Sequence, residues 1–231
     1  MLTVGNLNQF YGESHTLWDI DMNIQEGVCM CLMGRNGAGK TTLLKSLMGL
    51  LSIQTGAIRF RGKDITHSPT HVRARLGIGY IPQGREIFPQ LTVEENLRLG
   101  LTTHGSGAGE IPEKVFDLFP VLKKMLKRRG GNLSGGQQQQ LAIGRVLVTD
   151  PALLILDEPT EGIQPNVVRE IGDIILRLNK EDNITVLLVE QKLAFARRIA
   201  ERFCIIDKGR MVANGPIQDL DERLIQRHLR V

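Results

Sequence analysis

Cysteine is scarce in this chain, and no long apolar run or leader segment is visible. The 231 residues include 3 cysteines, an odd number that offers no disulfide framework of the kind that small secreted proteins use. No stretch approaches the ~18 consecutive apolar residues that span a bilayer, so we expect no integral membrane protein. The first ten residues, MLTVGNLNQF, contain no basic stretch followed by an apolar one, so no secretory signal is expected.

The composition is that of a folded protein of moderate size. Hydrophobic residues make up 42% of the chain and charged residues 23%, which argues against disorder. The length suits one large domain, or one core with a smaller inserted lobe. A formal charge of +4 permits a polyanionic partner but is more typical of a solubility effect.

Apolar runs that end in glycine predict an α/β fold. Alternating apolar residues before Gly27 predict short antiparallel strands, and the continuous run Val28–Met33 predicts a strand buried on both faces. Strands and helices alternate later in the chain, which predicts a parallel sheet wrapped in helices. The expected segments are helices at Thr41–Leu51, Pro165–Lys180 and Lys192–Glu201, and strands at Leu153–Leu156, Ile184–Val189 and Phe203–Ile206.

Helices dominate the middle of the chain. Thr92 and Glu95 have the spacing of a capping box and predict a helix that ends near Gly100. The segment His104–Gly109 is predicted to be a flexible loop. The tail Ile217–Val231 has apolar residues at helical spacing and predicts an amphipathic helix that docks on the rest of the chain.

The stretch GRNGAGKT fits the phosphate-binding pattern G-x-x-x-x-G-K-[ST]. It follows a buried strand and opens a helix, so backbone N–H groups and the positive end of the helix dipole would surround phosphates. Lys40 would neutralise the β- and γ-phosphates, and the Thr41 hydroxyl would bind Mg²⁺. The candidate ATP-binding residues here are Gly34, Arg35, Asn36, Gly37, Ala38, Gly39, Lys40, Thr41 and Thr42.

Two acidic residues end a later apolar strand. Asp157 and Glu158 follow Leu153–Leu156, which puts carboxylates at the carboxyl edge of the sheet, where α/β sheets bind ligands. Asp157 would hold Mg²⁺ through water, and Glu158 would orient or deprotonate the attacking water. Alone, this pair could be a strand running into a turn, but beside a phosphate loop the catalytic interpretation is favoured.

A third motif, LSGGQ, lies upstream of that strand. Ser134 is a good helix cap, and the glycines after it leave backbone N–H groups open to an anion. With this motif the chain resembles the nucleotide-binding subunits of ATP-binding cassette (ABC) transporters, over about residues 1–211 and with all motifs in the same order. The residues concerned are Ser134, Gly135, Gly136 and Gln137.

The resemblance implies a P-loop NTPase-type ABC nucleotide-binding domain with an antiparallel β subdomain and an inserted helical subdomain. Residues 1–83 and 130–231 would form the core with its β subdomain, and 84–129 the helical subdomain. Tyr11 would stack on adenine, although it could equally be a half-buried strand residue. Gln83 would contact the Mg²⁺ and γ-phosphate region.

The same resemblance implies an assembly. Two ATPase subunits would sandwich ATP head to tail, so that Ser134–Gln137 contact the nucleotide of the partner. We expect a second, non-identical ABC ATPase subunit, two membrane-spanning permease subunits and, indirectly, a solute-binding protein, but no nucleic acid. The chain would lie in the cytoplasm, peripheral to the inner face of the cell membrane. The permease would dock on Gly84–Pro89, so joint replacement of Arg85 and Glu86 should uncouple transport.

The chain departs from the family pattern at two places. Gln191 stands where the family has a histidine that contacts the γ-phosphate, and Glu161–Gln164 replaces the usual Ser-Ala-Leu-Asp. Glutamine can donate a hydrogen bond but carries no positive charge. Loss of one such transition-state contact slows a reaction by ~10²–10³-fold, so we hypothesise that this chain builds the slower of two composite sites.

At Val189–Gln191 and Gly84–Pro89 the chain resembles the ATPase pair of branched-chain amino acid and related amide importers. The stretch DEPTEGIQP, together with FPVLK at 119–123 and LSGGQQQQ at 133–140, most resembles the second ATPase of urea importers, and this resemblance implies import of urea or short-chain amides. The alternative is a branched-chain amino acid importer ATPase. Two further functions remain open: a soluble cassette protein acting on nucleic acid, and a non-catalytic ATP clamp. The first lacks the expected insertion or second cassette, and the intact Lys40, Thr41, Asp157 and Glu158 oppose the second.

Other residues have plainer interpretations. Cys29, Cys31 and Cys204 are expected to be small core residues. The single tryptophan, Trp18, is expected to pack between the strand layer and its neighbours.

Overall fold

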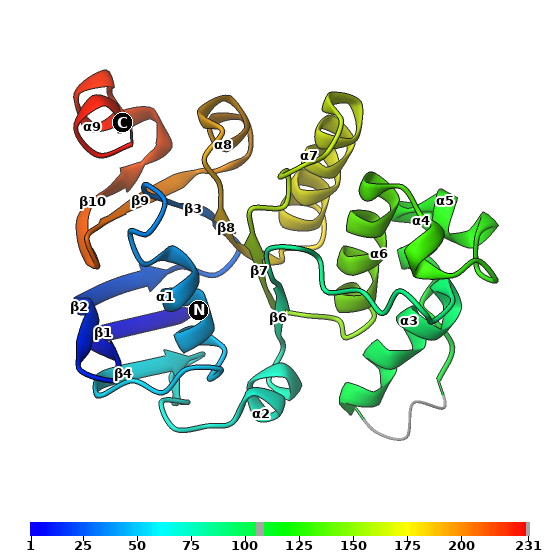
Figure 1. The fold of residues 1–231 in the computed structure, drawn as a ribbon, viewed down its shortest axis with the longest axis horizontal. Coiled ribbons are helices and arrows are strands. Elements are labelled where there is room, and N and C mark those ends of the chain that lie inside the picture. Colours follow the sequence, from blue (N-terminus) through cyan, green and yellow to red (C-terminus); the bar gives the residue numbers. More distant parts are fainter. Residues whose placement is uncertain (105–108, 230–231) are drawn as a thin grey trace.

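A six-stranded, mostly parallel sheet lies at the centre of the computed structural model, which describes residues 1–104 and 109–229 (Figure 1). Strand β10 (Arg210–Pro216) runs antiparallel to β9 (Arg202–Asp207), and every other neighbouring pair in this sheet is parallel. The strand order across the sheet is β10 (Arg210–Pro216), β9 (Arg202–Asp207), β3 (Cys29–Met33), β8 (Thr185–Val189), β7 (Leu153–Asp157) and β6 (Ile78–Ile81).

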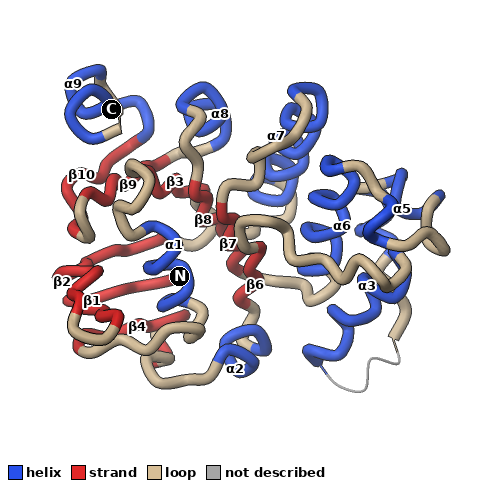
Figure 2. The backbone as a smooth tube through the Cα atoms, viewed as in Figure 1, coloured by secondary structure: helices blue, strands red, loops and turns tan. Residues whose placement is uncertain are grey.

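A second, four-stranded antiparallel sheet contains the N-terminal strands. Its pairing confirms the antiparallel arrangement predicted before Gly27. The order is β2 (Ser14–Ile24), β1 (Leu2–Tyr11), β4 (Thr55–Phe60) and β5 (Lys63–Asp64). Helix α1 (Lys40–Leu47) shares one apolar cluster with both sheets, and Figure 2 shows it between them.

Alternation along the central strands divides the core into two clusters. On β3, Cys29 and Cys31 belong to one cluster, whereas Met30 and Leu32 belong to the other. The first cluster lies under the later helices, and the second faces α1 and the antiparallel sheet. Cys29, Cys31 and Cys204 are free and buried, which confirms them as small core residues.

Helices cover the other face of the central sheet and extend beyond it (Figure 2). Helix α6 (Gly135–Leu147) lies outside the predicted helical subdomain of residues 84–129. It nevertheless packs with α3 (Val93–Leu101) and α5 (Pro120–Lys124), and Leu97, Leu122 and Leu141 belong to the same apolar cluster. The boundary at residue 129 stays a prediction. The helices are α2 (Thr70–Arg75), α3 (Val93–Leu101), α4 (Glu113–Leu118), α5 (Pro120–Lys124), α6 (Gly135–Leu147), α7 (Pro165–Lys180), α8 (Leu193–Ile199) and α9 (Glu222–His228), with short 3-10 turns at Thr102–His104, Gly130–Asn132 and Ile217–Asp219.

Most predicted elements appear close to their expected bounds. Helix α7 spans the predicted Pro165–Lys180, and Thr92 and Glu95 form the predicted capping box. Helix α1 ends before the predicted Leu51 because Gly49 takes a left-handed φ of 69°. Most of the loop predicted at His104–Gly109 lies outside the described residues. In the tail, the amphipathic helix predicted within Ile217–Val231 corresponds to α9, which spans the shorter segment Glu222–His228.

The expectation for Trp18 was wrong. Its residue is 36% exposed, and its ring stacks on His15 at 3.5 Å between centroids. The Arg210 guanidinium lies 4.8 Å from the indole ring on the same surface. The side chain is therefore a surface aromatic covered by polar groups. Among the described residues, no helix combines the length and apolar character needed to cross a membrane.

Candidate functional site

A pocket of about 650 Å³ opens at the carboxyl edge of the central sheet. Three segments meet there: the loop after β3, the loop after β7 and the loop after β8. The parallel strand order brings these loops together, since parallel strands end at one edge. Of the predicted site residues, the pocket wall contains Asn36, Gly37, Gly39, Lys40, Thr41, Thr42, Gln83, Glu158 and Gln191.

Two glycines of the loop after β3, Gly34 and Gly39, lie too close to neighbouring strands to carry a side chain. A Cβ at Gly34 would lie 2.3 Å from the Ile206 carbonyl oxygen. Gly39 caps α1 with a left-handed φ of 110°, and a Cβ there would lie 2.8 Å from Leu17 Cδ2. Only glycine therefore lets the loop pack on β9 and β2 while its helix begins at the pocket.

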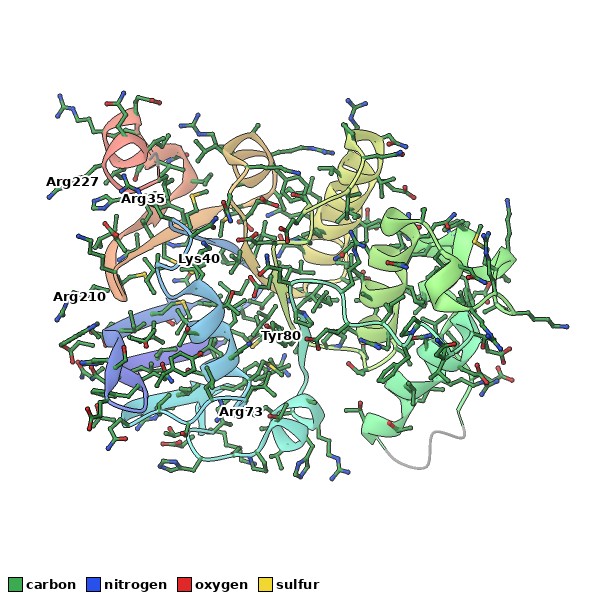
Figure 3. All side chains as sticks on the ribbon, in the orientation of Figure 1. Arg35, Lys40, Arg73, Tyr80, Arg210 and Arg227 are labelled. Atoms are coloured by element: carbon green, nitrogen blue, oxygen red, sulfur yellow. The ribbon has the colours of Figure 1, made fainter. Side chains whose placement is uncertain are left out.

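Lys40 points into the loop that carries it (Figure 3). Its Nζ donates to the carbonyl oxygens of Gly34 at 2.8 Å and Arg35 at 3.0 Å. Glu158 Oε1 lies 3.9 Å from the same nitrogen. Burial lowers the pKa of Lys40, and the carboxylates of Glu158 and Asp157 act in the opposite direction. The ammonium group is thus held where an anion entering the pocket would meet it.

Asp157 lies beneath the pocket, where Thr41 Oγ1 donates to its Oδ2 at 3.1 Å. Its Oδ1 is buried and has no hydrogen-bond partner within the described part of the chain. Burial raises the pKa of this carboxyl, the Thr41 hydrogen bond lowers it, and the charge of Glu158 raises it. An orphaned carboxylate oxygen beside a hydroxyl suits a hard divalent cation such as Mg²⁺, which would satisfy that oxygen.

Glu158 and Gln191 are in direct contact. Gln191 Nε2 donates to Glu158 Oε1 at 2.5 Å and to Asn36 Oδ1 at 2.9 Å. Glu158 has a left-handed φ of 49°, a conformation that a non-glycine residue holds only when its surroundings impose it. The position that departs from the family histidine therefore binds both the candidate base and the phosphate loop.

Gln83 reaches the pocket from the segment after β6. Its Nε2 donates to Glu161 Oε2 at 2.8 Å. Glu161 is one of the residues that depart from the family pattern, and it occupies the carboxamide that was predicted to contact the γ-phosphate region. A cation at Gln83 would bind the amide oxygen, Oε1, which this hydrogen bond does not use.

The remaining predicted residues lie outside the pocket wall. Tyr11 ends β1 and is 49% exposed, while Thr16 of β2 lines the pocket. Arg35 turns toward the C-terminal helix and donates to the Arg227 carbonyl oxygen at 3.4 Å (Figure 3). Gly34 and Arg35 line a separate hollow of about 320 Å³ beside Leu229. The buried Ala38 lies in the core cluster that contains α1.

The LSGGQ residues are at the start of α6 and do not line the pocket of their own chain. Ser134 caps the helix as predicted: Gln137 N–H donates to its Oγ at 3.4 Å, and its own N–H donates to Gln137 Oε1 at 3.0 Å. At Gly136 a Cβ would lie 2.8 Å from Val167 Cγ1. Gly135 lies beside the Arg85 guanidinium.

Sequence reasoning missed five polar residues of the pocket wall: Thr16, Thr160, Glu161 as a hydrogen-bond partner, Glu190 and Lys192. Glu190 is 3% exposed and Thr160 fully buried. Glu190 and Lys192 flank Gln191, and Thr160 and Glu161 follow Glu158 within three residues, so these four positions were visible. The signal that could have found them is a polar residue at the carboxyl end of a buried parallel strand.

Arg85, within the predicted docking segment Gly84–Pro89, is half-buried and contacts two other elements. Its Nη1 donates to Gln138 Oε1 at 3.3 Å and its Nη2 to the Glu161 carbonyl oxygen at 3.4 Å. By contrast, Glu86 and Phe88 line an apolar groove of about 480 Å³. The Arg85 guanidinium thus reaches α6 and the loop after β7, and its role in docking stays a prediction.

Comparison with known proteins identifies the family. The model of the ABC transporter family matches residues 17–161. The high-affinity branched-chain amino acid transport ATP-binding protein BraG of Pseudomonas aeruginosa is 40% identical over 92% of this chain and 91% of its own length. The probable branched-chain amino acid transport ATP-binding protein LivF of Archaeoglobus fulgidus is 39% identical over 96% of this chain and 94% of its own.

Solved structures agree with this result. A nucleotide-free ATP-binding cassette from an ABC transporter superposes with a TM-score of 0.86 at 27% identity, covering 98% of this chain and 97% of that one. A dimeric cassette in a post-hydrolysis state, bound to ADP and Pi, gives a TM-score of 0.84 at 28% identity over 94% of this chain and 99% of that one. The fold predicted from the sequence is thereby confirmed. The chain belongs to the ABC transporter family, as an ATP-binding subunit whose ATPase activity drives transport.

Proposed function

We propose that this chain is an ATPase subunit of an importer for branched-chain amino acids. The observation that carries the proposal is its 40% identity to a branched-chain amino acid transport ATPase over 92% of the chain. The sequence-based preference for urea or short-chain amides rests on three short stretches, Asp157–Pro165, Phe119–Lys123 and Leu133–Gln140. The relatives favour the alternative, because both match nearly the whole chain.

An uptake experiment tests this assignment. Deletion of the gene is expected to abolish uptake of radiolabelled leucine and to leave urea uptake unchanged. Wild-type protein should restore leucine uptake, and a Lys40→Ala variant should not, because it lacks the phosphate-binding ammonium group. Loss of urea uptake with normal leucine uptake would instead support the urea and short-chain amide assignment.

In the proposed mechanism, the loop of Gly34–Thr42 binds the ATP phosphates, and Lys40 faces the β- and γ-phosphates. Thr41, Asp157 and Gln83 would hold Mg²⁺, which stabilises the charge that develops during phosphoryl transfer. Glu158 accepts a proton from the attacking water, and Gln191 orients Glu158 through the 2.5 Å hydrogen bond. Tyr11 would stack on adenine from the edge of the antiparallel sheet.

The position of the LSGGQ segment supports a head-to-tail pair of ATPase subunits. Ser134–Gln137 lie outside their own chain's pocket. The capping box uses the N–H groups of Ser134 and Gln137, and those of Gly135 and Gly136, which take no part in it, would face the nucleotide of a second subunit. We propose that the second subunit is a non-identical ATPase, and that two permease subunits and a solute-binding protein complete the transporter. The chain would then act at the inner face of the cell membrane.

We place the permease contact in the groove that Glu86 and Phe88 line. Leu50 and Phe88, both in this groove, are 52% and 49% exposed, and exposed apolar residues in a groove are typical of protein contacts. Leu50→Asp is expected to reduce uptake by about tenfold while ATP binding is retained. Val212→Asp on β10, 41% exposed and outside the groove, is the matched control. Equal effects of the two variants on uptake would contradict this placement.

The hypothesis of a slow site predicts the effect of Gln191→His. An imidazolium can carry positive charge against the γ-phosphate, so turnover of the complete complex is expected to rise, by up to ~10²-fold. Gln191→Ala is expected to lower turnover, because Glu158 loses its hydrogen-bond donor. Steady-state phosphate release measures both variants. An unchanged or lower rate in Gln191→His would contradict the hypothesis.

A further inference from the structure

Two loops supply the catalytic wall of the pocket, and they come from neighbouring strands. The loop after β7 carries Glu158, and the loop after β8 carries Gln191. Catalysis depends on their spacing, since a displacement of ~1 Å can cost ~10²-fold in rate. The two side chains meet at 2.5 Å, so the backbones behind them have to be held in register.

The buried carboxylate of Glu190 connects the loop after β7 to the loop after β8. Its Oε2 accepts from Thr160 Oγ1 at 2.6 Å, a buried contact to the loop after β7. Its Oε1 accepts from the backbone N–H groups of Gln191 at 2.8 Å and Lys192 at 3.0 Å. One carboxylate, 3% exposed, thus binds three donors across both loops. Hydrogen bonds to an ionised acceptor are roughly twice as strong as neutral ones.

Lys192 adds a second connection in the opposite direction. Its Nζ donates to the Thr160 carbonyl oxygen at 2.9 Å. Thr160 is therefore held at its hydroxyl by Glu190 and at its carbonyl by Lys192, and its residue is fully buried. A third link is the Glu158 N–H, which donates to the Val189 carbonyl oxygen at 3.0 Å.

We propose that Glu190 and Thr160 are positioning residues for ATP hydrolysis, which hold Glu158 against Gln191. This inference rests on the proposed hydrolytic role of Glu158. Glu158 lies two residues before Thr160 and has a left-handed φ of 49°. Its carboxylate therefore keeps its orientation toward Gln191 only while the hydrogen bonds of Thr160 fix the loop. The phosphate loop follows a different strand, β3, so we expect loss of the Glu190–Thr160 hydrogen bond to change nucleotide affinity little.

The test uses the complete transporter complex and the variant Thr160→Val, which removes the hydroxyl and keeps the side-chain shape. Turnover at saturating ATP is expected to fall by about tenfold, with the KM for ATP unchanged. Thr160→Ser, which restores the hydroxyl, is expected to recover most of the turnover. Glu190→Asp, which keeps the charge but shortens the side chain by one methylene, is expected to show the same loss of turnover as Thr160→Val.

Combining Thr160→Val with Glu158→Gln distinguishes a positioning role of Thr160 from a general disturbance of the fold. If Thr160 acts through Glu158, adding Thr160→Val to a Glu158→Gln chain is expected to cause no further loss in single-turnover hydrolysis of radiolabelled ATP. An equal loss in both backgrounds, a proportional rise in KM, or no recovery with serine would overturn the proposal. Failure of the proposed role of Glu158 would look different, because the Glu158→Gln chain would then hydrolyse ATP at the wild-type rate.

Discussion

Replacing Glu158 with glutamine is expected to slow ATP hydrolysis by about 10²–10⁴-fold and to leave ATP binding intact. The substitution keeps the size of the side chain but removes the group that accepts a proton from water. Glu158 lies 3.9 Å from Lys40 Nζ and bonds Gln191, so its carboxylate stands where a γ-phosphate held by Lys40 would meet the attacking water. Phosphate release and retention of radiolabelled ATP measure the two effects.

Glu161→Gln is the matched control, because it makes the same chemical change in the same pocket. The Glu161 carboxylate bonds Gln83 instead of Gln191, and its replacement is expected to change turnover by less than about tenfold. If the Glu158→Gln chain hydrolyses ATP at the wild-type rate, Glu158 is not the base. A wild-type chain that binds ATP without turning it over would support the ATP clamp.

The second large effect is expected at Arg73, in stability. Arg73 of α2 is 2% exposed, and its side chain reaches toward the end of α1 (Figure 3). Its guanidinium donates to the carbonyl oxygens of Ser46, Leu47, Thr66 and Ser68 at distances between 2.8 and 2.9 Å. Burial lowers the pKa of this arginine. No carboxylate pairs with it in the described ranges, so the carbonyls at the negative end of α1 are its partners.

Arg73→Met is expected to reduce the free energy of unfolding by about 3–5 kcal/mol, because it leaves these buried carbonyl oxygens without donors. For a chain of this length the melting temperature should fall by roughly 10 °C. Arg73→Lys should recover only part of the loss, since an ammonium lacks the planar fork of five donors. Thermal and urea unfolding measure both variants.

Arg75→Met on the same helix is the control. Arg75 is exposed, and its Nε donates to the Thr103 carbonyl oxygen at 3.2 Å, so its replacement is expected to cost less than about 1 kcal/mol. Equal destabilisation by the two variants would show that α2 tolerates no methionine, and the assignment of the Arg73 contacts as the cause would be rejected.

The elements that sequence reasoning placed correctly are those with local causes. The bounds of helix α7 follow from apolar residues at helical spacing and from a proline in its first turn. The caps at Thr92 and Ser134 depend on residues three positions apart. The phosphate loop depends on a run of eight residues whose glycines are needed for the turn itself. Such features survive in any tertiary context, and the pattern alone predicts them.

The error at Trp18 has a partly non-local cause. Trp18 alternates with buried residues of β2, but the outer face of that strand is open, and the ring contacts His15 of the same strand and Arg210 of β10. Arg85 follows a pocket residue, and its guanidinium donates to Gln138 of α6. Arg210 and Gln138 belong to elements distant in sequence, so these two contacts cannot be read from the neighbouring residues.

The sequence by itself determined the chemistry of this protein: a phosphate loop, a strand ending in two carboxylates and an LSGGQ segment, each a short pattern with a local physical reason. Only the tertiary structure decided how these parts are held. Glu190 binds Thr160 across 30 positions of sequence, and Arg73 reaches Ser46 across 27. Both side chains are charged, and residues of this kind are normally solvated at the surface. Their burial depends on donors and acceptors that only the folded chain brings together.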